Sequence, residues 1–585
     1  MKKIKYLLFG LVAFLFPLSL TAQTIVHVPP GLGTLNDSIK ADGSAIYLLQ
    51  PGGWYGLNAT LQITTPVQII GGDTTAGMPA MIQTGSTTSG TTFAYMFVVH
   101  GNLTIRNVFL VNADLNNGIG IGTFQITAPD RLLLDSVTVD PVGRAFFIRK
   151  GVDSCATYVT NSLIMGHGNT TSINDGWLFN NQNNGMWDTL YVENNTFVDV
   201  GTDFLIAGAQ KTDRENLVWI NHNSFFFGKA NFFGFWGPYN AYVTNNLMWN
   251  YDFNPIKNAW SAFQSGKLGS LIWTDTLRIP RVGTTDTTET LPSSRDFFLE
   301  YNSNFRSQGV WDLVSQVNDS ATTDSAGWLP TYLYDFIPSP TDSTSESQMF
   351  NSKTSFPGFY CNNNISDSGS ANPADDPDFL DPHIAALTDS AIAWAKQSTF
   401  QLEGHMLSAP SAWPNYFYYP DTGGVGDPMA WPRFNGVYSN SKLLTASIEG
   451  LPLGDLNWFP KDKVLWEENK AAIMQHILSE NESRMTLTAV TASASQLPTK
   501  FILSQNYPNP FNPTTQIEYS IPQNVYVTLK VFNVLGQEVA TLFSGMRTPG
   551  RYVATFNASK YASGVYFYRI QAGHYSATKK LMLVK

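Results

Sequence analysis

A short strand motif recurs seven times between residues 103 and 301. Most copies carry two apolar residues separated by one residue, then a polar residue, then Asn or a substitute. The copies are LTIRN at 103–107, LLLDS at 132–136, TYVTN at 157–161, LYVEN at 190–194, VWINH at 218–222, AYVTN at 241–245 and FFLEY at 297–301. They recur every 23 to 33 residues, apart from a final interval of 56, which one missed copy would explain. Repeats of this length with strand alternation predict stacked β-coils.

The predicted fold class is all-β: a right-handed parallel β-helix followed by a small immunoglobulin-like β-sandwich. The right hand is expected because parallel crossover connections strongly prefer it. Asn suits the corners of the coils because it adopts the left-handed backbone region cheaply, and stacked Asn side chains can hydrogen-bond from coil to coil. For the repeat region, a sandwich of short antiparallel hairpins is the alternative.

The composition limits the classes of protein to which the chain can belong. Hydrophobic residues make up 43% of the 585 residues and charged residues 14%, which provides for a large core rather than extended disorder. Lys and Arg number 35 against 45 Asp and Glu, and this net charge of −10 disfavours sequence-independent nucleic-acid binding. Two cysteines, Cys155 and Cys361, exclude a disulfide scaffold, while one bridge or two free thiols both stay open.

The first 22 residues have the pattern of a secretory signal peptide. Lys2, Lys3 and Lys5 precede an apolar run, 6–20, that is short for a membrane span. We expect cleavage after Ala22 and an extracellular or outer cell-surface location, with no transmembrane segment in the mature chain. An uncleaved anchor helix is the alternative.

The segment AIYLLQPGGWYGLNATLQITTPVQIIGG at 45–72 resembles the first coils of the pectate-lyase-like superfamily of right-handed β-helices. The resemblance extends over roughly residues 25–305. It implies a carbohydrate as the substrate class, although one fold hosts many chemistries.

One outward-facing position of the repeat is rich in aromatic residues. Side chains alternate faces along a strand, so the residue between the two apolar anchors points away from the coil interior. Down the stack this position reads Thr104, Leu133, Tyr158, Tyr191, Trp219, Tyr242 and Phe298. Coils lie about 4.8 Å apart, so the five rings would form a stripe on which successive sugars could stack. We predict that these five rings bind carbohydrate.

The alternative interpretation of the stripe is an ordinary buried contact. Later segments could fold back over the rings, and three candidates are the insertion at 253–296, the Ser/Thr/Asp-rich stretch at 315–348 and the aromatic stretch at 413–420.

The next outward position supplies weak catalytic candidates, namely Asp135, Glu193 and Arg106, with Glu300 further along. Asp135 and Glu193 should lie about 10 Å apart, just beyond the carboxylate separation of inverting glycosidases. A lyase would instead need a cation or Arg to neutralise a uronate, and a base. Scattered surface carboxylates are the alternative.

Two further motifs resemble known sites but lack their context. Asp188 and Asp203 match the aspartates of pectin methylesterases in type, yet 15 residues are too few to place them on adjacent coils. Asp375, Asp376, Asp378 and Asp381 could hold calcium, although a turn-rich closing loop is favoured there. The sequence therefore indicates no metal site, and the cofactor is left undetermined.

The tail carries the most specific motifs. SQNYPNPFNPTTQIEYSIP at 504–522, VFNVLGQEVATL at 531–542, ASGVYFYRI at 562–570 and KKLMLVK at 579–585 resemble a type IX secretion system C-terminal sorting domain. This resemblance implies a partner, the type IX secretion machinery, and export across an outer membrane. The alternating apolar pattern fits a seven-stranded antiparallel sandwich.

The predicted domains are a signal peptide at 1–22, a β-helix with inserted loops at 23–370, a closing segment with two helices at 371–485, a linker at 486–497 and the sorting domain at 498–585. The helices are expected at 381–396 and 462–478. The predicted function is a secreted or cell-surface polysaccharide-binding β-helix protein. Cleavage of the polysaccharide by lyase or hydrolase chemistry is left open, and a non-catalytic surface adhesion or structural protein is the alternative.

Overall fold

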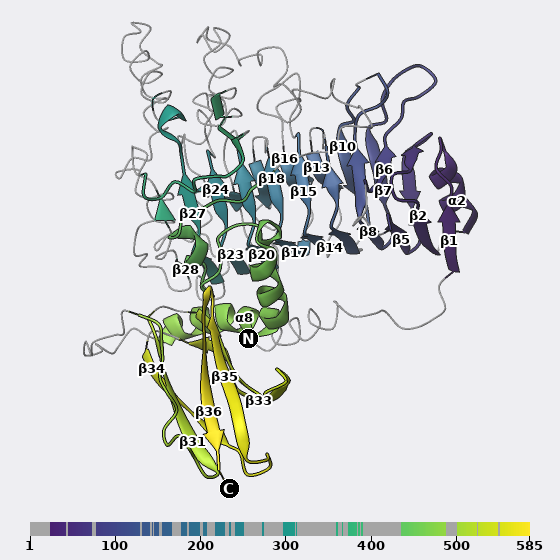
Figure 1. Ribbon diagram of the computed structural model, residues 1–585. Helices are drawn as coiled ribbons and strands as arrows, with labels where there is room; N and C mark the ends of the chain where they lie inside the picture. The colour runs from purple at the N-terminus through teal and green to yellow at the C-terminus, as the bar shows by residue number, and fades with distance from the viewer. Residues whose placement is uncertain are drawn as a thin grey trace, which may run out of the picture. The chain divides into compact units, whose positions relative to one another are not determined.

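The computed structural model describes residues 24–250 with short gaps, 272–273, 296–310, 312, 359–360 and 365–366, most of 373–389, and 435–584 apart from 487–499, 523–524 and 548–549. The chain divides into two compact units, Met1–Ser439 and Asn440–Lys585. In the first unit successive coils contribute strands to three parallel sheets of 11, 10 and 8 strands, here called A, B and C (Figure 1). This confirms the predicted parallel β-helix.

Sheet A contains the repeated motif, and its strands are β1 (Thr24–Val28), β2 (Ala45–Leu49), β5 (Val67–Ile70), β8 (Leu103–Arg106), β11 (Arg131–Asp135), β14 (Cys155–Thr160), β17 (Trp187–Glu193), β20 (Leu217–Asn221), β23 (Asn240–Thr244), β26 (Asp296–Glu300) and β28 (Phe359–Tyr360). Each strand of sheet B comes after a strand of sheet A in the chain. The strands of sheet B are β3 (Trp54–Gly56), β6 (Ala80–Gln83), β9 (Val108–Val111), β12 (Thr138–Val139), β15 (Leu163–Met165), β18 (Thr196–Val198), β21 (Ser224–Phe226), β24 (Leu247–Trp249), β27 (Ser303–Phe305) and β29 (Ile365–Ser366). Sheet C closes each coil, with β4 (Leu61–Ile63), β7 (Tyr95–Val99), β10 (Gly122–Ile126), β13 (Ala145–Lys150), β16 (Trp177–Asn183), β19 (Asp203–Ala207), β22 (Phe233–Phe235) and β25 (Ile272–Trp273).

The long final interval of the repeat is an insertion and contains no missed coil. Strands β23 and β26 pair directly, with Val243 opposite Leu299. The expectation of a missed copy was therefore wrong. The extra residues fall inside one coil, where strand pairing places no limit on the length of the connection between neighbouring rungs.

The coil interior is filled by stacked apolar side chains. In sheet C the rings of Phe97, Phe124, Phe147 and Phe179 stack with centroid distances of 5.0, 5.2 and 5.0 Å. These values match the spacing of neighbouring strands, which is about 4.8 Å. All four rings are buried, so the parallel stacking of identical residues supplies a continuous core.

The fifth residue of each motif copy makes the corner between sheets A and B. Seven residues there have φ values between 53° and 60°: Asn107, Ser136, Asn161, Asn194, His222, Asn245 and Tyr301. Asn reaches this left-handed region at low cost, which explains its frequency. Ser136, His222 and Tyr301 adopt the same conformation because the stacked coils impose it.

A ladder of asparagine side chains begins one residue later. Asn195, Asn223, Asn246 and Asn302 form a row in which each Nδ2 donates to Oδ1 of the next Asn, at 2.9, 3.0 and 2.9 Å. The same Nδ2 atoms also donate to backbone carbonyls of the preceding coil, for example Asn195 to Val159 at 2.9 Å. The predicted coil-to-coil bonding of Asn is therefore confirmed.

A short helix covers the first coils. Helix α2 (Thr34–Asp42) contacts β1, β2 and β3, and its buried residues Leu35 and Ile39 are one turn apart. Figure 1 shows α2 at the β1 end of the stack. This helix was not expected from the sequence.

The second unit combines a helical segment with an antiparallel sandwich. The segment contains η4 (Leu443–Thr445), η5 (Leu456–Trp458) and α8 (Pro460–Thr486), so the helix expected at 462–478 is confirmed and is longer at both ends. One sheet of the sandwich has β30 (Ile502–Leu503), β31 (Thr514–Ile521) and β34 (Gly550–Asn557), and the other has β33 (Glu538–Arg547), β32 (Val525–Phe532), β35 (Gly564–Ala572) and β36 (Tyr575–Leu583). All pairs are antiparallel, which confirms the predicted immunoglobulin-like sandwich.

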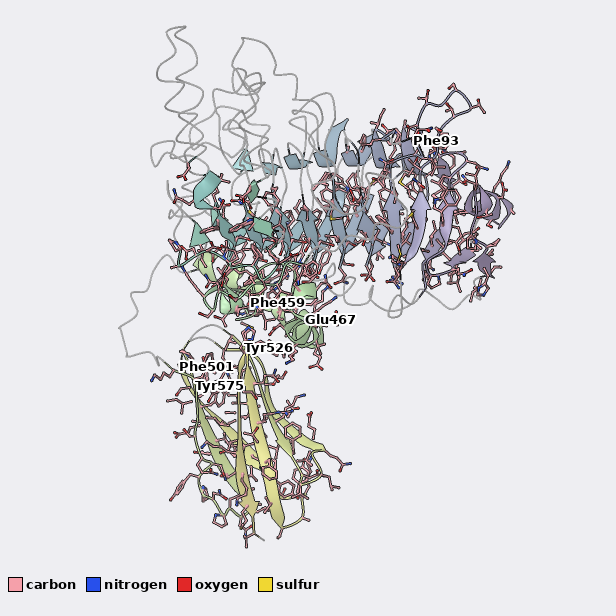
Figure 2. All side chains as sticks on the ribbon, turned by 45° about the horizontal axis from the view of Figure 1, so that its top comes forward. Phe93, Phe459, Glu467, Phe501, Tyr526 and Tyr575 are labelled. Atoms are coloured by element: carbon pink, nitrogen blue, oxygen red, sulfur yellow. The ribbon has the colours of Figure 1, made fainter. Side chains whose placement is uncertain are left out.

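Within this unit the sandwich packs against both the segment that precedes α8 and the first turn of α8. The backbone N–H of Tyr526 donates to the carbonyl of Glu449 at 3.1 Å. Nδ1 of His574 lies 3.4 Å from a carboxylate oxygen of Asp462. At the same end of the sandwich, Phe501 and Tyr575 stack with a centroid distance of 5.0 Å (Figure 2).

Several predicted features lie outside the described residues. These are the signal peptide, nearly all of the linker, Cys361, the segments proposed to cover the stripe and most of the helix expected at 381–396. Within the described part of the chain, no helix combines the length and apolarity that a membrane crossing requires.

Candidate functional site

The predicted aromatic stripe is in register along sheet A. Tyr158 pairs with Tyr191, Tyr191 with Trp219, Trp219 with Tyr242, and Tyr242 with Phe298. The ring centroids of successive pairs are 5.9, 6.2, 5.5 and 6.4 Å apart, and the Tyr191 and Trp219 rings are nearly parallel, at 3°. The rings therefore form one stack, on the side of the sheet that alternation predicts.

The stack is largely covered. Tyr191, Trp219, Tyr242 and Phe298 are exposed by 3, 2, 2 and 0% of their surface, and only Tyr158 is half-buried. An extended sugar chain could not lie on the four buried rings in this structure. Their burial matches the alternative interpretation of the stripe as a packing contact, and it leaves Tyr158 as the accessible ring.

Glu193 lies in the middle of the covered part and is itself buried. Its carboxylate accepts hydrogen bonds from Oη of Tyr191, from Nε1 of Trp219 at 3.1 Å and from Nδ2 of Asn221 at 3.0 Å. Burial, followed by the charge of Glu193, raises the pKa of Tyr191 well above its ordinary value. Tyr191 therefore stays protonated and donates to the carboxylate.

Asp135, two coils away, also accepts hydrogen bonds from the neighbouring rung. Its Oδ1 accepts from Oγ1 of Thr160 at 2.9 Å and from Nδ2 of Asn161 at 2.8 Å, and Nε of Arg106 lies 3.5 Å from its other oxygen. Arg106 and Asp135 remain partly exposed. Thr160 and Asn161 both belong to the next coil, so the Asp135 carboxylate links neighbouring rungs.

The same inter-rung pattern recurs further along the row. Oδ1 of Asn221 accepts from Oγ1 of Thr244 at 2.8 Å and from Nδ2 of Asn245 at 2.9 Å. An oxygen-bearing side chain on one rung thus takes one bond from its row neighbour and one from the corner Asn of the following rung. Asp135 follows this scheme, whereas Glu193 accepts from its row neighbour Asn221 and from the side chains of Tyr191 and Trp219. Their geometry is that of structural acceptors.

An open part of the outer face remains at β8, β11 and β14. It is formed by outward side chains that are neither fully buried nor fully exposed: Thr104, Arg106, Arg131, Leu133, Asp135, Tyr158 and Thr160. We call this set the open face. Burial raises the pKa of the Tyr158 hydroxyl, the nearby charge of Arg131 opposes that rise, and the charge of Asp188 adds to it. Strand β14, which carries the accessible ring, therefore lies between β11, which carries Arg131, and β17, which carries Asp188.

Two members of this neighbourhood were not singled out as site residues from the sequence. Arg131 stands two residues before Leu133, so the same alternation places it outward and could have identified it. The sequence indicated Asp188 only through its resemblance to an esterase motif. That resemblance fails in the structure, because Asp188 lies in sheet A whereas Asp203 lies in sheet C.

Two aspartates of the acidic segment at 375–381 accept hydrogen bonds from residues 435 and 439. Asp378 accepts from Oγ of Ser439 at 2.5 Å, and Asp381 accepts from the backbone N–H of Asn435 at 3.2 Å. Burial raises the pKa of Asp376. In the described part of the chain, no group of three or more His, Cys, Asp or Glu side chains is placed to hold a metal ion.

Comparison with protein families concerns the second unit. Residues 505–585 match the family described as a secretion system C-terminal sorting domain. This match confirms the sorting domain that the tail motifs predicted, and it implies export of the chain. The matched residues include most of the sandwich and none of the β-helix strands.

The β-helix has a weak structural likeness to a solved enzyme. The structure titled "Structure of PL6 family alginate lyase AlyGC" aligns with a TM-score of 0.26 and 15% identity, over 46% of this chain and 40% of that one. A similarity at this level carries no argument about activity. The search of curated proteins finds no match.

Proposed function

We propose that this chain is an exported β-helix protein that binds polysaccharide through the open face of sheet A. Export rests on the sorting-domain match. The single observation that supports binding is the half-buried ring of Tyr158, on a strand between those that carry Arg131 and Asp188. An aromatic face can stack on a sugar ring, while Arg and carboxylate groups beside it hydrogen-bond sugar hydroxyls.

The hydrogen bonding of the two candidate carboxylates favours binding of a polysaccharide over its cleavage. Both candidate residues, Asp135 and Glu193, accept several hydrogen bonds from neighbouring rungs. A general acid or base must instead reach its substrate, and a catalytic pair must flank the bond that breaks. The buried position of Glu193 does not support that role.

Affinity electrophoresis tests the binding proposal. The full chain would be run in gels containing pectin, alginate, xylan or laminarin, and we expect retardation by at least one of them. Tyr158→Ala should weaken retention about threefold or more, the size expected for one lost ring contact. Tyr507→Ala is the matched control, because that tyrosine is 82% exposed and lies in the sandwich. Unchanged retention of both the Tyr158→Ala and Arg131→Ala variants would contradict the proposal.

A second candidate is a non-catalytic adhesion or structural protein of the cell surface. The burial of four of the five predicted sugar-binding rings favours it, since these rings serve packing. The two candidates differ in the same gels: the second predicts no retardation by any polysaccharide. Release of reducing ends or unsaturated uronates from the panel would contradict the second candidate, and it would show that the first candidate also cleaves the polysaccharide that it binds.

A further inference from the structure

The sorting domain presents two large apolar side chains at the tip of one hairpin. Val534 and Leu535 lie in the turn between β32 and β33 and are 68 and 79% exposed. Neither belongs to the buried core of the sandwich, which the strands supply. The turn Asn533–Gln537 is called the apolar tip below.

The apolar tip is held in one conformation by hydrogen bonds. Oδ1 of Asn533 accepts from the backbone N–H groups of Leu535 and Gln537, both at 3.0 Å. The backbone N–H of Asn533 donates to the Gln537 carbonyl at 3.0 Å, and Nδ2 donates to the Gln537 side chain at 2.9 Å. Gly536 has a φ of 78°, which the turn requires and which glycine adopts without strain.

The turn itself explains Asn533 and Gly536 but gives no reason for two aliphatic residues between them. Polar residues would form the same backbone bonds and would avoid exposing apolar surface to water. A rigid turn also loses little conformational entropy when a partner binds it. Preorganised and apolar, the tip has the features of a binding anchor.

The surroundings of the tip favour a protein partner over a lipid surface. The sequence FNVLGQE at 532–538 contains no Lys or Arg. Two cations on β32 and β35 are engaged within the domain, since Lys530 pairs with Glu538 at 3.2 Å and Arg569 lies over the Phe532 ring at 4.7 Å. Membrane-binding segments usually offer cations and interfacial aromatic residues to the lipid headgroups. An uncharged apolar pocket suits this tip better.

We propose that the apolar tip docks into an apolar pocket on a protein of the secretion machinery. The occupant follows from the location of the tip, which lies inside residues 505–585, the segment that matches a secretion sorting domain. A sorting domain must be read by the machinery that exports it, and Val534 with Leu535 is an adjacent apolar pair that the matched domain exposes at a fixed turn. The proposal does not depend on glycan binding.

The test uses the full chain in a host that carries the matching secretion system. We expect Val534→Ser combined with Leu535→Ser to lower the amount delivered outside the cell about tenfold or more, with the unexported chain accumulating inside. Val553→Ser is the matched control, because Val553 is 55% exposed on β34 of the same domain. Val534→Ile combined with Leu535→Met keeps the apolar surface and should preserve delivery.

Three outcomes would overturn the proposal. The first is normal delivery of the double Ser variant, and the second is a similar loss in the Val553→Ser control. The third is flotation of the purified chain with vesicles of phosphatidylethanolamine and phosphatidylglycerol that the double Ser variant abolishes, which would assign the tip to a lipid surface. Thermal melting of the purified variants separates folding from docking: an unchanged melting temperature is expected, because both side chains are exposed.

Discussion

Nε1 of Trp219 donates a hydrogen bond of 3.1 Å to Oε1 of Glu193 on the neighbouring strand. The bond joins a residue predicted to bind sugar with a residue predicted as a weak catalytic candidate. Both side chains are buried, and Tyr191 and Asn221 complete the donor set. The relationship assigns both residues to the stability of the coil stack.

Replacing Glu193 should therefore destabilise the β-helix. Glu193→Ala leaves three buried donors without their acceptor, and each unsatisfied group costs about 1–3 kcal/mol. We expect the unfolding free energy to fall by roughly 3 kcal/mol or more, and Glu193→Gln to cost less because it retains one carbonyl acceptor. Chemical denaturation followed by circular dichroism measures both.

Asp37→Ala on α2 is the control for a carboxylate of the same unit. Asp37 is exposed in the first turn of the helix, so its removal should cost less than about 1 kcal/mol. Full stability of Glu193→Ala together with lost polysaccharide retention would reverse the assignment and make Glu193 a binding residue.

The repeat made the fold predictable because strand alternation and corner asparagines are local properties of the sequence. The register of Tyr191, Trp219 and Tyr242 followed directly from aligning motif copies. Their burial did not follow, because it depends on what lies over the sheet, and no local pattern encodes that. Asn221 was missed for a similar reason: it is one more polar residue in the motif until its bonds to Glu193 and Thr244 are seen.

The asparagine ladder should be a second determinant of stability. Asn223 donates through Nδ2 to Val192, Asn221 and Asn246, and its Oδ1 accepts from Asn195. Asn223→Ala removes this set from a buried site, and we expect a loss of about 3 kcal/mol or more. Asn36→Ala is the control, because Asn36 makes exposed bonds with Ala59 and Asn58 and should cost about 1 kcal/mol at most. Equal melting temperatures of the two variants would contradict a structural role for the ladder.

Stability should also depend on the protonation of Asp140. Burial raises the pKa of Asp140 from 3.8 to about 7 in the folded chain. The folded state therefore favours the protonated carboxyl, and this contribution is complete below pH 3.8, declines as pH rises and is lost above pH about 7. Asp140→Asn should match the parent near pH 4 and be more stable than the parent above pH 7.

Thermal melting across pH 4 to 8 checks this dependence. Asp37→Asn serves as the reference, because its exposed side chain should give a difference that varies little over the same range. A constant difference between Asp140→Asn and the parent from about pH 4 to 8 would show that Asp140 has an ordinary pKa.

Packing of the sandwich against the segment before α8 depends on a glycine. Gly573 has a φ of 57°, and a Cβ there would lie 2.6 Å from the carbonyl oxygen of Gly450. Gly573→Ala should therefore combine backbone strain of about 1–2 kcal/mol with displacement of the Gly450 backbone. Gly536→Ala isolates the strain, since Gly536 has a φ of 78° and nothing lies within 4 Å of its added Cβ. We expect Gly573→Ala to lower the melting temperature of the second unit more than Gly536→Ala does, and to increase proteolysis between Leu444 and Asp462. Equal effects of the two substitutions would mean that the Gly450 contact contributes nothing to the packing of the sandwich.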